Sequence, residues 1–89
     1  MQKKTLTIIN KLGLHTRAAS KLVELTSKYK STINLVYNNK KVNGKSIIAV
    51  MTLAACYDTQ IEIIIDGEDE AELMSYIEKL FRDRFQESE

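Results

Sequence analysis

The sequence predicts an α+β fold, an open-faced sandwich in which a four-stranded antiparallel sheet carries three helices on one face. Two observations favour this fold class. Apolar residues change between the alternate spacing of strands and the three- or four-residue spacing of helices, in the order β-α-β-β-α-β-α. No linker-like, repetitive or low-complexity stretch divides the 89 residues, so we expect one domain spanning residues 1–89.

The first half of the chain contains three predicted strands and one helix. A half-buried strand is expected over about residues 3–9, where leucine and isoleucine alternate with threonine. Helical spacing of apolar side chains predicts an amphipathic helix over roughly residues 16–28. Residues 33–37 and 40–42 are then expected to form two strands of a hairpin, because the Asn38-Asn39 pair suits a tight turn with positive φ.

The second half is predicted to contain a short helix, a fourth strand and a longer helix. Ser46 follows the loop 43–45 and stands where a helix N-cap is expected, immediately before a run of apolar residues. The strand is expected over residues 60–66, with Ile61, Ile63 and Ile65 on one face and Ile64 on the other. The last helix is predicted over about residues 70–85, with acids in its first turn and Arg82 and Arg84 in its last.

Composition excludes several classes of protein. A single cysteine, Cys56, excludes an internal disulfide, and together with a single histidine, His15, it excludes the Cys/His clusters of structural zinc sites. No apolar run approaches the ~20 residues of a membrane span, and the N-terminus lacks the apolar segment of a signal peptide. We therefore expect a soluble cytoplasmic protein without membrane insertion.

The net charge of +1 conceals an asymmetry between the two halves. Residues 1–45 carry ten Lys/Arg and one acid, a charge of +9, whereas residues 46–89 carry three Lys/Arg and eleven acids, a charge of −8. If the basic residues share a face, they favour an acidic partner, which is a nucleic acid, a membrane surface or an acidic protein. The alternative is that folding mixes the two halves into a neutral surface.

The only histidine lies in the loop that opens the first predicted helix. A helix N-terminus offers unpaired N–H groups and a positive dipole end, which hold an anion and favour the neutral, nucleophilic imidazole. A phosphoryl group on His15 would lie near the backbone N–H groups of Thr16, Arg17 and Ala18, and the Arg17 guanidinium could bind its oxygens. His-x-Arg alone is a weak signal, and a surface loop that happens to contain both residues is the plainer interpretation.

The start of the second predicted helix offers a hydroxyl beside a basic residue, Lys45. Ser46 there is an ordinary cap, yet a phosphate on it would meet the helix dipole and add roughly −1.5 to −2 charge to the surface, which could act as a switch. Ile47, Ile48, Met51 and Leu53 cover more than one face of so short a helix. They are either all core or partly exposed as an apolar docking patch.

Other chemistry-bearing residues are weaker candidates. Cys56 stands alone and is expected to be a buried small hydrophobe. Five acids between residues 66 and 72 cluster as metal ligands do, but they lack EF-hand spacing, and acids are ordinary at a helix start, so we expect no metal. The three glycines do not form a phosphate-binding loop, which argues against nucleotide binding and predicts no cofactor.

Residues 10–17 (NKLGLHTR) and 42–51 (VNGKSIIAVM) resemble the two signatures of HPr, the histidine phosphocarrier of the bacterial phosphoenolpyruvate-dependent sugar phosphotransferase system. The resemblance covers the whole chain and includes Ser27-Lys28-Tyr29 and residues 34–38 between the motifs. It implies the same open-faced sandwich. It also implies that His15 accepts a phosphoryl group through Nδ1 from phosphorylated enzyme I and donates it to enzyme IIA proteins, with Arg17 steadying the phosphate.

The resemblance also implies regulation and docking. Ser46 aligns with the serine that an ATP-dependent HPr kinase/phosphorylase modifies in bacteria that use it for catabolite control, where a catabolite-control regulator is a further partner. A monomer is the family expectation, and such a carrier is a substrate and donor for phosphotransferases and not itself an enzyme. The residues that the resemblance assigns to partner docking are Thr16, Ser20, Lys21, Ile47, Ile48 and Met51.

The sequence departs from the family pattern at three places. Thr16 and Ala18 stand where the family usually has alanine and proline, and the missing proline removes a preset φ from the first helical turn. Glu24 stands where many members of the family have a neutral or basic residue near the docking face, which bears on the choice of partner. Tyr57-Asp58 replaces a Lys-Gly turn, although aspartate tolerates positive φ.

Two alternatives to the sugar phosphocarrier remain. One is a nitrogen-branch or regulatory paralogue of the same fold, which sequence cannot separate from it. The other is a nucleic-acid-binding domain that uses Lys21 and Lys28 of the basic half, although that half offers only Tyr29 and Tyr37 for base stacking. The sugar that is taken up is also not encoded in this chain.

Overall fold

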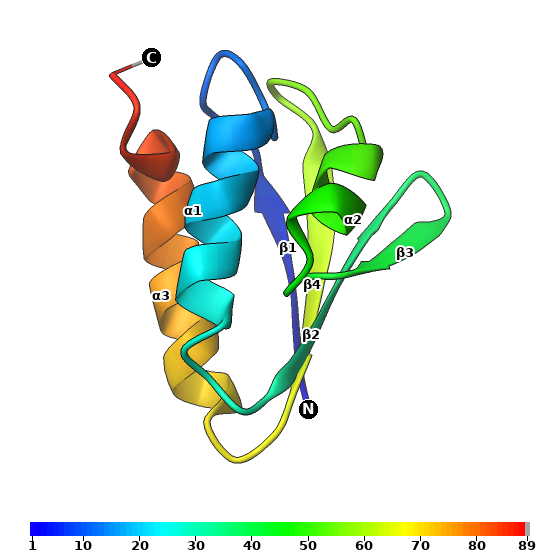
Figure 1. The fold of residues 1–89 in the computed structure, drawn as a ribbon, viewed down its shortest axis with the longest axis vertical. Helices are drawn as coiled ribbons and strands as arrows, with labels where there is room; N and C mark the ends of the chain where they lie inside the picture. The colour runs from blue at the N-terminus through cyan, green and yellow to red at the C-terminus, as the bar shows by residue number, and fades with distance from the viewer. Residues whose placement is uncertain (89) are drawn as a thin grey trace.

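A computed structural model describes residues 1–88, which form one four-stranded antiparallel sheet covered by helices on one face (Figure 1). The strand order is β1-β4-β2-β3, so the α+β fold class predicted from the sequence is confirmed. The elements are β1 (Gln2–Thr7), α1 (Thr16–Thr26), β2 (Thr32–Tyr37), β3 (Lys40–Asn43), α2 (Ile47–Thr52), β4 (Gln60–Asp66), α3 (Glu70–Arg82) and a 3-10 turn, η1 (Arg84–Gln86).

Strand β4 carries the centre of the core. Ile61, Ile63 and Ile65 are fully buried between the sheet and the helices, whereas Ile64 lies half-buried on the other face, as the alternation predicts. β4 pairs with β1 on one side and β2 on the other, so its three buried isoleucines lie in the middle of the sheet. Burial of each contributes about 1.5–3 kcal/mol, which fixes the register of the sheet.

The predicted hairpin turn is present. Asn38 and Asn39 have φ of 53° and 64° and join β2 to β3. Both values lie in the left-handed region that a two-residue hairpin with right-handed strand twist requires. Asp58 also has a positive φ, 66°, so an aspartate serves the turn in which the related family has glycine.

The C-terminal end of α3 differs from the prediction. The helix ends at Arg82, and Arg84, Phe85 and Gln86 have φ between 53° and 64°, a short left-handed turn. Such backbone costs about 1–2 kcal/mol per residue. Burial of Phe85, whose ring centre lies 4.8 Å from that of Phe81, offsets much of this cost because the left-handed turn places the ring in the core. Helical periodicity could not indicate this turn.

The last described residues lie near the loop that precedes α1. The segment after η1 runs along the same end of the molecule as the loop before α1 (Figure 1). Two segments from opposite ends of the sequence therefore meet beside the start of α1.

The prediction that Cys56 is buried is wrong. The residue is exposed, and its thiol contacts the carbonyl oxygen of Ala54 at 3.5 Å. Helix α2 ends at Thr52, so the helical pattern no longer decides which side chains of the following turn face the core. Ala55 is the buried residue of this turn, and its carbonyl oxygen accepts a hydrogen bond from the N–H of Leu14 at 3.0 Å.

Candidate functional site

His15 is the N-cap of α1. Its carbonyl oxygen accepts the first helical hydrogen bond, from the N–H of Ala19 at 2.9 Å, and its extended backbone turns the side chain back over the helix start. Nδ1 of the imidazole faces the N–H of Arg17, 3.4 Å away. The side chain keeps 29% of its surface exposed, so the ring is accessible while one of its nitrogens lies at the positive end of the helix.

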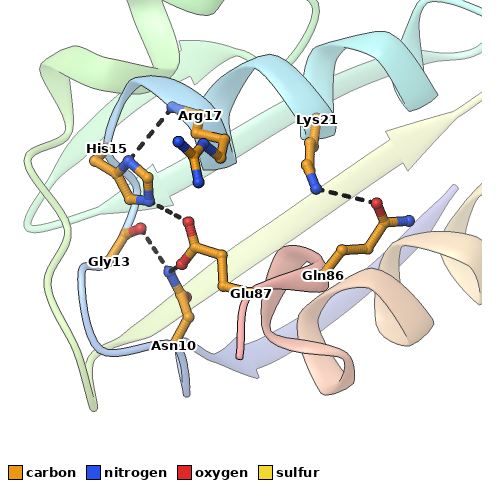
Figure 2. A network of polar contacts seen from close by, with 7 residues as sticks. All are labelled: Asn10, Gly13, His15, Arg17, Lys21, Gln86 and Glu87. Carbon is orange, nitrogen blue, oxygen red and sulfur yellow. Dashed lines mark hydrogen bonds and ion pairs between the residues drawn. The ribbon is translucent and has the colours of Figure 1, made fainter. Parts of the chain in front are cut away.

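The other ring nitrogen of His15 contacts a residue that the sequence did not indicate. Nε2 contacts Oε2 of Glu87, and Oε1 of the same carboxylate accepts a hydrogen bond from Nδ2 of Asn10 at 3.0 Å (Figure 2). Asn10 is fully buried, and Nδ2 also donates to the carbonyl oxygen of Gly13 at 2.8 Å. The loop before α1 and the C-terminal segment are thus joined through Glu87, which contacts both His15 and Asn10.

Opposing effects act on the Glu87 carboxyl group. Burial favours its neutral form, but the hydrogen bonds from Asn10 and His15 and the positive charge of Arg17 favour the carboxylate. The net result is that the pKa of Glu87 lies below its ordinary value. The group is therefore an anion, which can only accept hydrogen bonds, at neutral pH.

Cations surround an open cleft beside His15. Lys11 and Arg17 line it from the loop and the start of α1, and Lys21 lines it from the next turn of the helix. Nζ of Lys21 donates to Oε1 of Gln86 at 3.1 Å, which holds the C-terminal segment along the opposite wall (Figure 2). The basic first half of the chain thus supplies the positive charge of this cleft, and Glu87 supplies a negative charge within it.

The two start residues of α1 that depart from the family pattern do not prevent the helix from forming. α1 begins at Thr16, which is exposed, and Ala18 is fully buried in the core. Alanine at this position fits because it is a strong helix former and needs no preset φ. Unlike proline, alanine keeps its backbone N–H, so residue 18 adds a donor to the start of α1.

Ser46 is the N-cap of α2, as predicted. Its Oγ accepts a hydrogen bond from the N–H of Ala49 at 3.2 Å, and its side chain is half-buried. Lys45, which the sequence places beside it, turns its ammonium group to the carbonyl oxygen of Tyr29, 2.6 Å away. The hydroxyl of Ser46 and the ammonium of Lys45 therefore do not form one site.

Helix α2 presents an apolar surface, which we call the α2 patch. It consists of Ile47, Ile48 and Met51, and Ile48 has 76% of its surface exposed. Leu53, the fourth residue considered from the sequence, is buried in the core. α2 packs beside α1 (Figure 1), so the patch borders the helix that carries His15, Ser20 and Lys21.

The acids near the start of α3 have structural partners. Both carboxylate oxygens of Asp69 accept hydrogen bonds from the turn before β2, from the N–H groups of Lys30 and Ser31 at 2.9 Å and 3.0 Å. Glu70 contacts the N-terminal ammonium at 2.9 Å. Among residues 1–88, no group of three or more His, Cys, Asp or Glu side chains is arranged to hold a metal ion.

Sequence reasoning missed Glu87 and Asn10. Asn10 belongs to the first motif, but an asparagine before a glycine turn reads as an ordinary turn residue. Glu87 follows the end of all periodic patterns, and only the buried position of Phe85 shows that the chain turns toward His15. No local signal could have found it.

The chain is similar to known proteins in both sequence and structure. A family model described as the PTS HPr component phosphorylation site matches residues 2–83. The phosphocarrier protein HPr of Xylella fastidiosa is 48% identical over 87 residues, which cover 98% of both chains. That of Neisseria meningitidis serogroup A is 46% identical over 89 residues, covering 100% of both. The crystal structure of HPr-C-His from Thermoanaerobacter tengcongensis superposes with a TM-score of 0.95 at 36% identity, covering 100% of both chains.

Proposed function

Because this chain belongs to the HPr family of phosphocarrier proteins of the phosphotransferase system, we propose that His15 is the residue that carries its phosphoryl group. The observation that supports this assignment most directly is the position of Nδ1. It faces the N–H of Arg17 at the start of α1, where the helix dipole favours an anion. His15 is also the only histidine in the chain.

In the proposed reaction, the lone pair of Nδ1 attacks phosphorus on phosphorylated enzyme I. The N–P bond to His15 forms as the bond to enzyme I breaks, and the electron pair of that bond remains with enzyme I. The phosphoryl oxygens are then held by backbone N–H groups of residues 16–18 and by the Arg17 guanidinium. Transfer to an enzyme IIA protein reverses these steps, so the carrier is regenerated and acts as substrate and donor, not as a catalyst.

The partners that this function needs would bind the face around His15. The α2 patch supplies exposed apolar area, and the cations of the cleft attract an acidic surface. Thr16, Ser20 and Lys21 lie on α1, the helix against which α2 packs. The nucleic-acid alternative has less support, because Tyr29 and Tyr37 are partly buried against the core, which reduces the ring surface that could stack on bases.

A cytoplasmic location fits phosphoryl transfer from phosphoenolpyruvate. Among the described residues, no helix combines the length and the apolar character that crossing a membrane requires. We further propose that phosphorylation of Ser46 by an HPr kinase regulates docking. It would place a dianion directly before the α2 patch, where partners would otherwise meet an apolar surface.

The test is phosphorylation of the full chain by enzyme I, Mg²⁺ and phosphoenolpyruvate, followed by intact-mass measurement before and after mild acid. We expect a gain of one phosphoryl group that acid removes and that His15→Ala lacks. Phosphate retained by folded His15→Ala would refute the assignment. Transfer rates to sugar-type and nitrogen-type enzyme IIA proteins then separate the sugar carrier from its nitrogen-branch paralogue.

A further inference from the structure

We propose that Glu87 is a positioning residue for phosphoryl transfer: its carboxylate holds the His15 imidazole in the tautomer that carries the proton on Nε2 and leaves the lone pair of Nδ1 available. This inference rests on the proposed function of His15. It assigns a role in that function to the segment that follows the last helix.

The contacts of the imidazole select this tautomer. In a neutral imidazole, one nitrogen carries a proton and donates a hydrogen bond, and the other accepts one. Nδ1 faces a donor, the N–H of Arg17, and Nε2 faces an acceptor, the carboxylate of Glu87. Only a proton on Nε2 satisfies both contacts. The opposite tautomer would direct an N–H against the N–H of Arg17 and would remove the nucleophilic lone pair.

Asn10 presents a hydrogen-bond donor to Glu87, so the atom of residue 87 that faces Asn10 must be an acceptor. Its amide NH₂ donates to the Gly13 carbonyl at 2.8 Å and to Oε1 of Glu87 at 3.0 Å, so two acceptors fix the amide orientation. The same orientation leaves the buried Oδ1 of Asn10 without a hydrogen-bond partner within residues 1–88. A buried acceptor without a partner is costly, which indicates that the two donated hydrogen bonds determine the arrangement.

The chain after α3 holds Glu87 in place. The left-handed turn at Arg84–Gln86 directs the backbone toward His15, and the buried ring of Phe85 anchors that turn. Gln86 accepts a hydrogen bond from Lys21. As a result, the side chain of Glu87 is only 11% exposed although it lies near the chain end. Strained backbone that the surrounding contacts enforce is typical of functional positions.

The carboxylate would also act during transfer. When the lone pair of Nδ1 forms the N–P bond, positive charge develops on the ring, and the proton stays on Nε2 in contact with Glu87. The bond to the donor breaks with its electron pair remaining on the donor, so no proton needs to leave the site. A carboxylate that orients a histidine and stabilises its developing charge acts similarly in serine hydrolases.

The substitution Glu87→Gln gives a sharp test because of Asn10. The new side chain must turn its carbonyl oxygen to the Asn10 NH₂, so its own NH₂ faces Nε2 of His15. This close contact at Nε2 outweighs the longer, 3.4 Å contact of Nδ1 with the N–H of Arg17, so Nε2 becomes the acceptor and the proton moves to Nδ1. We expect ¹⁵N chemical shifts of the neutral His15 ring to report Nε2-H in the wild type and mainly Nδ1-H in Glu87→Gln. The initial rate of phosphorylation by enzyme I should fall about tenfold or more.

Two further variants separate this effect from a change of charge or a loss of structure. Glu87→Asp keeps an acceptor-only group and is expected to retain the Nε2-H tautomer and most of the transfer rate. Glu68→Gln makes the same chemical change at an exposed position in the loop between β4 and α3, which lies at the other end of the molecule (Figure 1). It should leave tautomer and rate unchanged. Circular dichroism checks that each variant is folded.

The outcomes are distinct. An unchanged tautomer in folded Glu87→Gln overturns the inference, and so does a changed tautomer with a transfer rate within twofold of the wild type. If enzyme I phosphorylates none of the proteins, including the wild type, the proposed function fails and the transfer role of Glu87 fails with it. In that case a tautomer change still supports the hydrogen-bond assignment, because the spectrum needs no partner protein.

Discussion

Replacement of Gly13 by alanine should disturb both stability and the site. Gly13 has a φ of +69°, and a Cβ added there would lie 2.5 Å from the carbonyl oxygen of Ala55 and 3.0 Å from Cα of Cys56. Both obstacles are backbone atoms, so rotation of a side chain cannot relieve the overlap. The two loops must separate by about 1 Å to reach ordinary contact, which weakens the hydrogen bond from Leu14 to Ala55.

The cost follows from these changes. Left-handed backbone costs alanine about 1–2 kcal/mol, the lost hydrogen bond about 1 kcal/mol, and the forced separation about 1 kcal/mol, while alanine restricts the unfolded chain and returns about 0.5–1 kcal/mol. We expect Gly13→Ala to lower the free energy of unfolding by about 3 kcal/mol. For a domain of this size, that is a decrease in Tm of more than about 10 °C.

Gly44→Ala is the matched control. A Cβ there would lie 2.9 Å from side-chain atoms of Ile33 and Leu35, and the carbonyl oxygen of Gly44 contacts Thr26, at the other end of α1 from His15. It should reduce stability through core strain but leave the ¹⁵N spectrum of His15 unchanged, whereas Gly13→Ala should change both. Urea unfolding and the spectrum are measured on each. A Gly13→Ala variant within about 1 kcal/mol of the wild type would refute the argument from backbone overlap.

Three other predictions concern groups remote from His15. Thr26→Val should lower the free energy of unfolding by about 1–2 kcal/mol in urea titrations. The reason is that the carbonyl oxygen of Gly44, which accepts a hydrogen bond from the buried Thr26 hydroxyl at 2.8 Å, would lose its donor. Equal stability of the variant and the wild type would contradict this. Hydrogen bonds from Ser31 and from the backbone hold the pKa of Asp69 below its usual range, so this stabilisation is present above the ordinary aspartate pKa and is lost as the pH falls through the lower, folded value. Asp69→Asn should thus lower the urea midpoint at neutral pH and flatten its acid dependence, and an unchanged dependence would count against the contact. Burial and the Glu72 carboxylate raise the pKa of Tyr29 to about 12. Ultraviolet titration should therefore show a tyrosine that ionises at high pH, and it should ionise at lower pH in Glu72→Gln. Because the folded protein holds the phenol proton more tightly than the unfolded chain does, the free energy of unfolding should fall as the pH rises from about 10.

Those parts of the fold that depend on neighbouring residues were predictable from the sequence. The β4 strand, with its alternating isoleucines, and the cap at Ser46 lie where the pattern places them. The Asn38-Asn39 turn is a local choice too, because two adjacent residues that tolerate positive φ determine it. Each of these features depends on residues that are close together in the sequence, and a periodic pattern reports contacts over that range.

The parts that the sequence did not reveal depend on contacts between distant segments. Cys56 has an apolar neighbourhood in the sequence, yet its turn is placed by the contact of Ala55 with Leu14. The end of α3 is set by the space that the core leaves for Phe85. Glu87 reaches His15 after a left-handed turn that the buried ring of Phe85 anchors. In each case the deciding neighbour is remote in sequence, so a local pattern could not report it.

The fold brings charged residues of the two halves of the sequence together, most clearly around His15. Acids of the second half pair with the first half in places, as Glu78 does with Lys4 at 2.7 Å, so part of the opposite charge of the two halves is neutralised locally. Around His15, however, the first half contributes the cations of the cleft and the second half contributes one carboxylate. In the proposed reaction, a phosphoryl group that approaches Nδ1 would meet the helix start and Arg17, while the anion Glu87 contacts the opposite nitrogen of the ring. Under the proposed mechanism, charge that would repel the phosphate at Nδ1 would instead favour the nucleophilic tautomer from Nε2, and this separation across one ring explains how an acid can belong to an anion-transfer site.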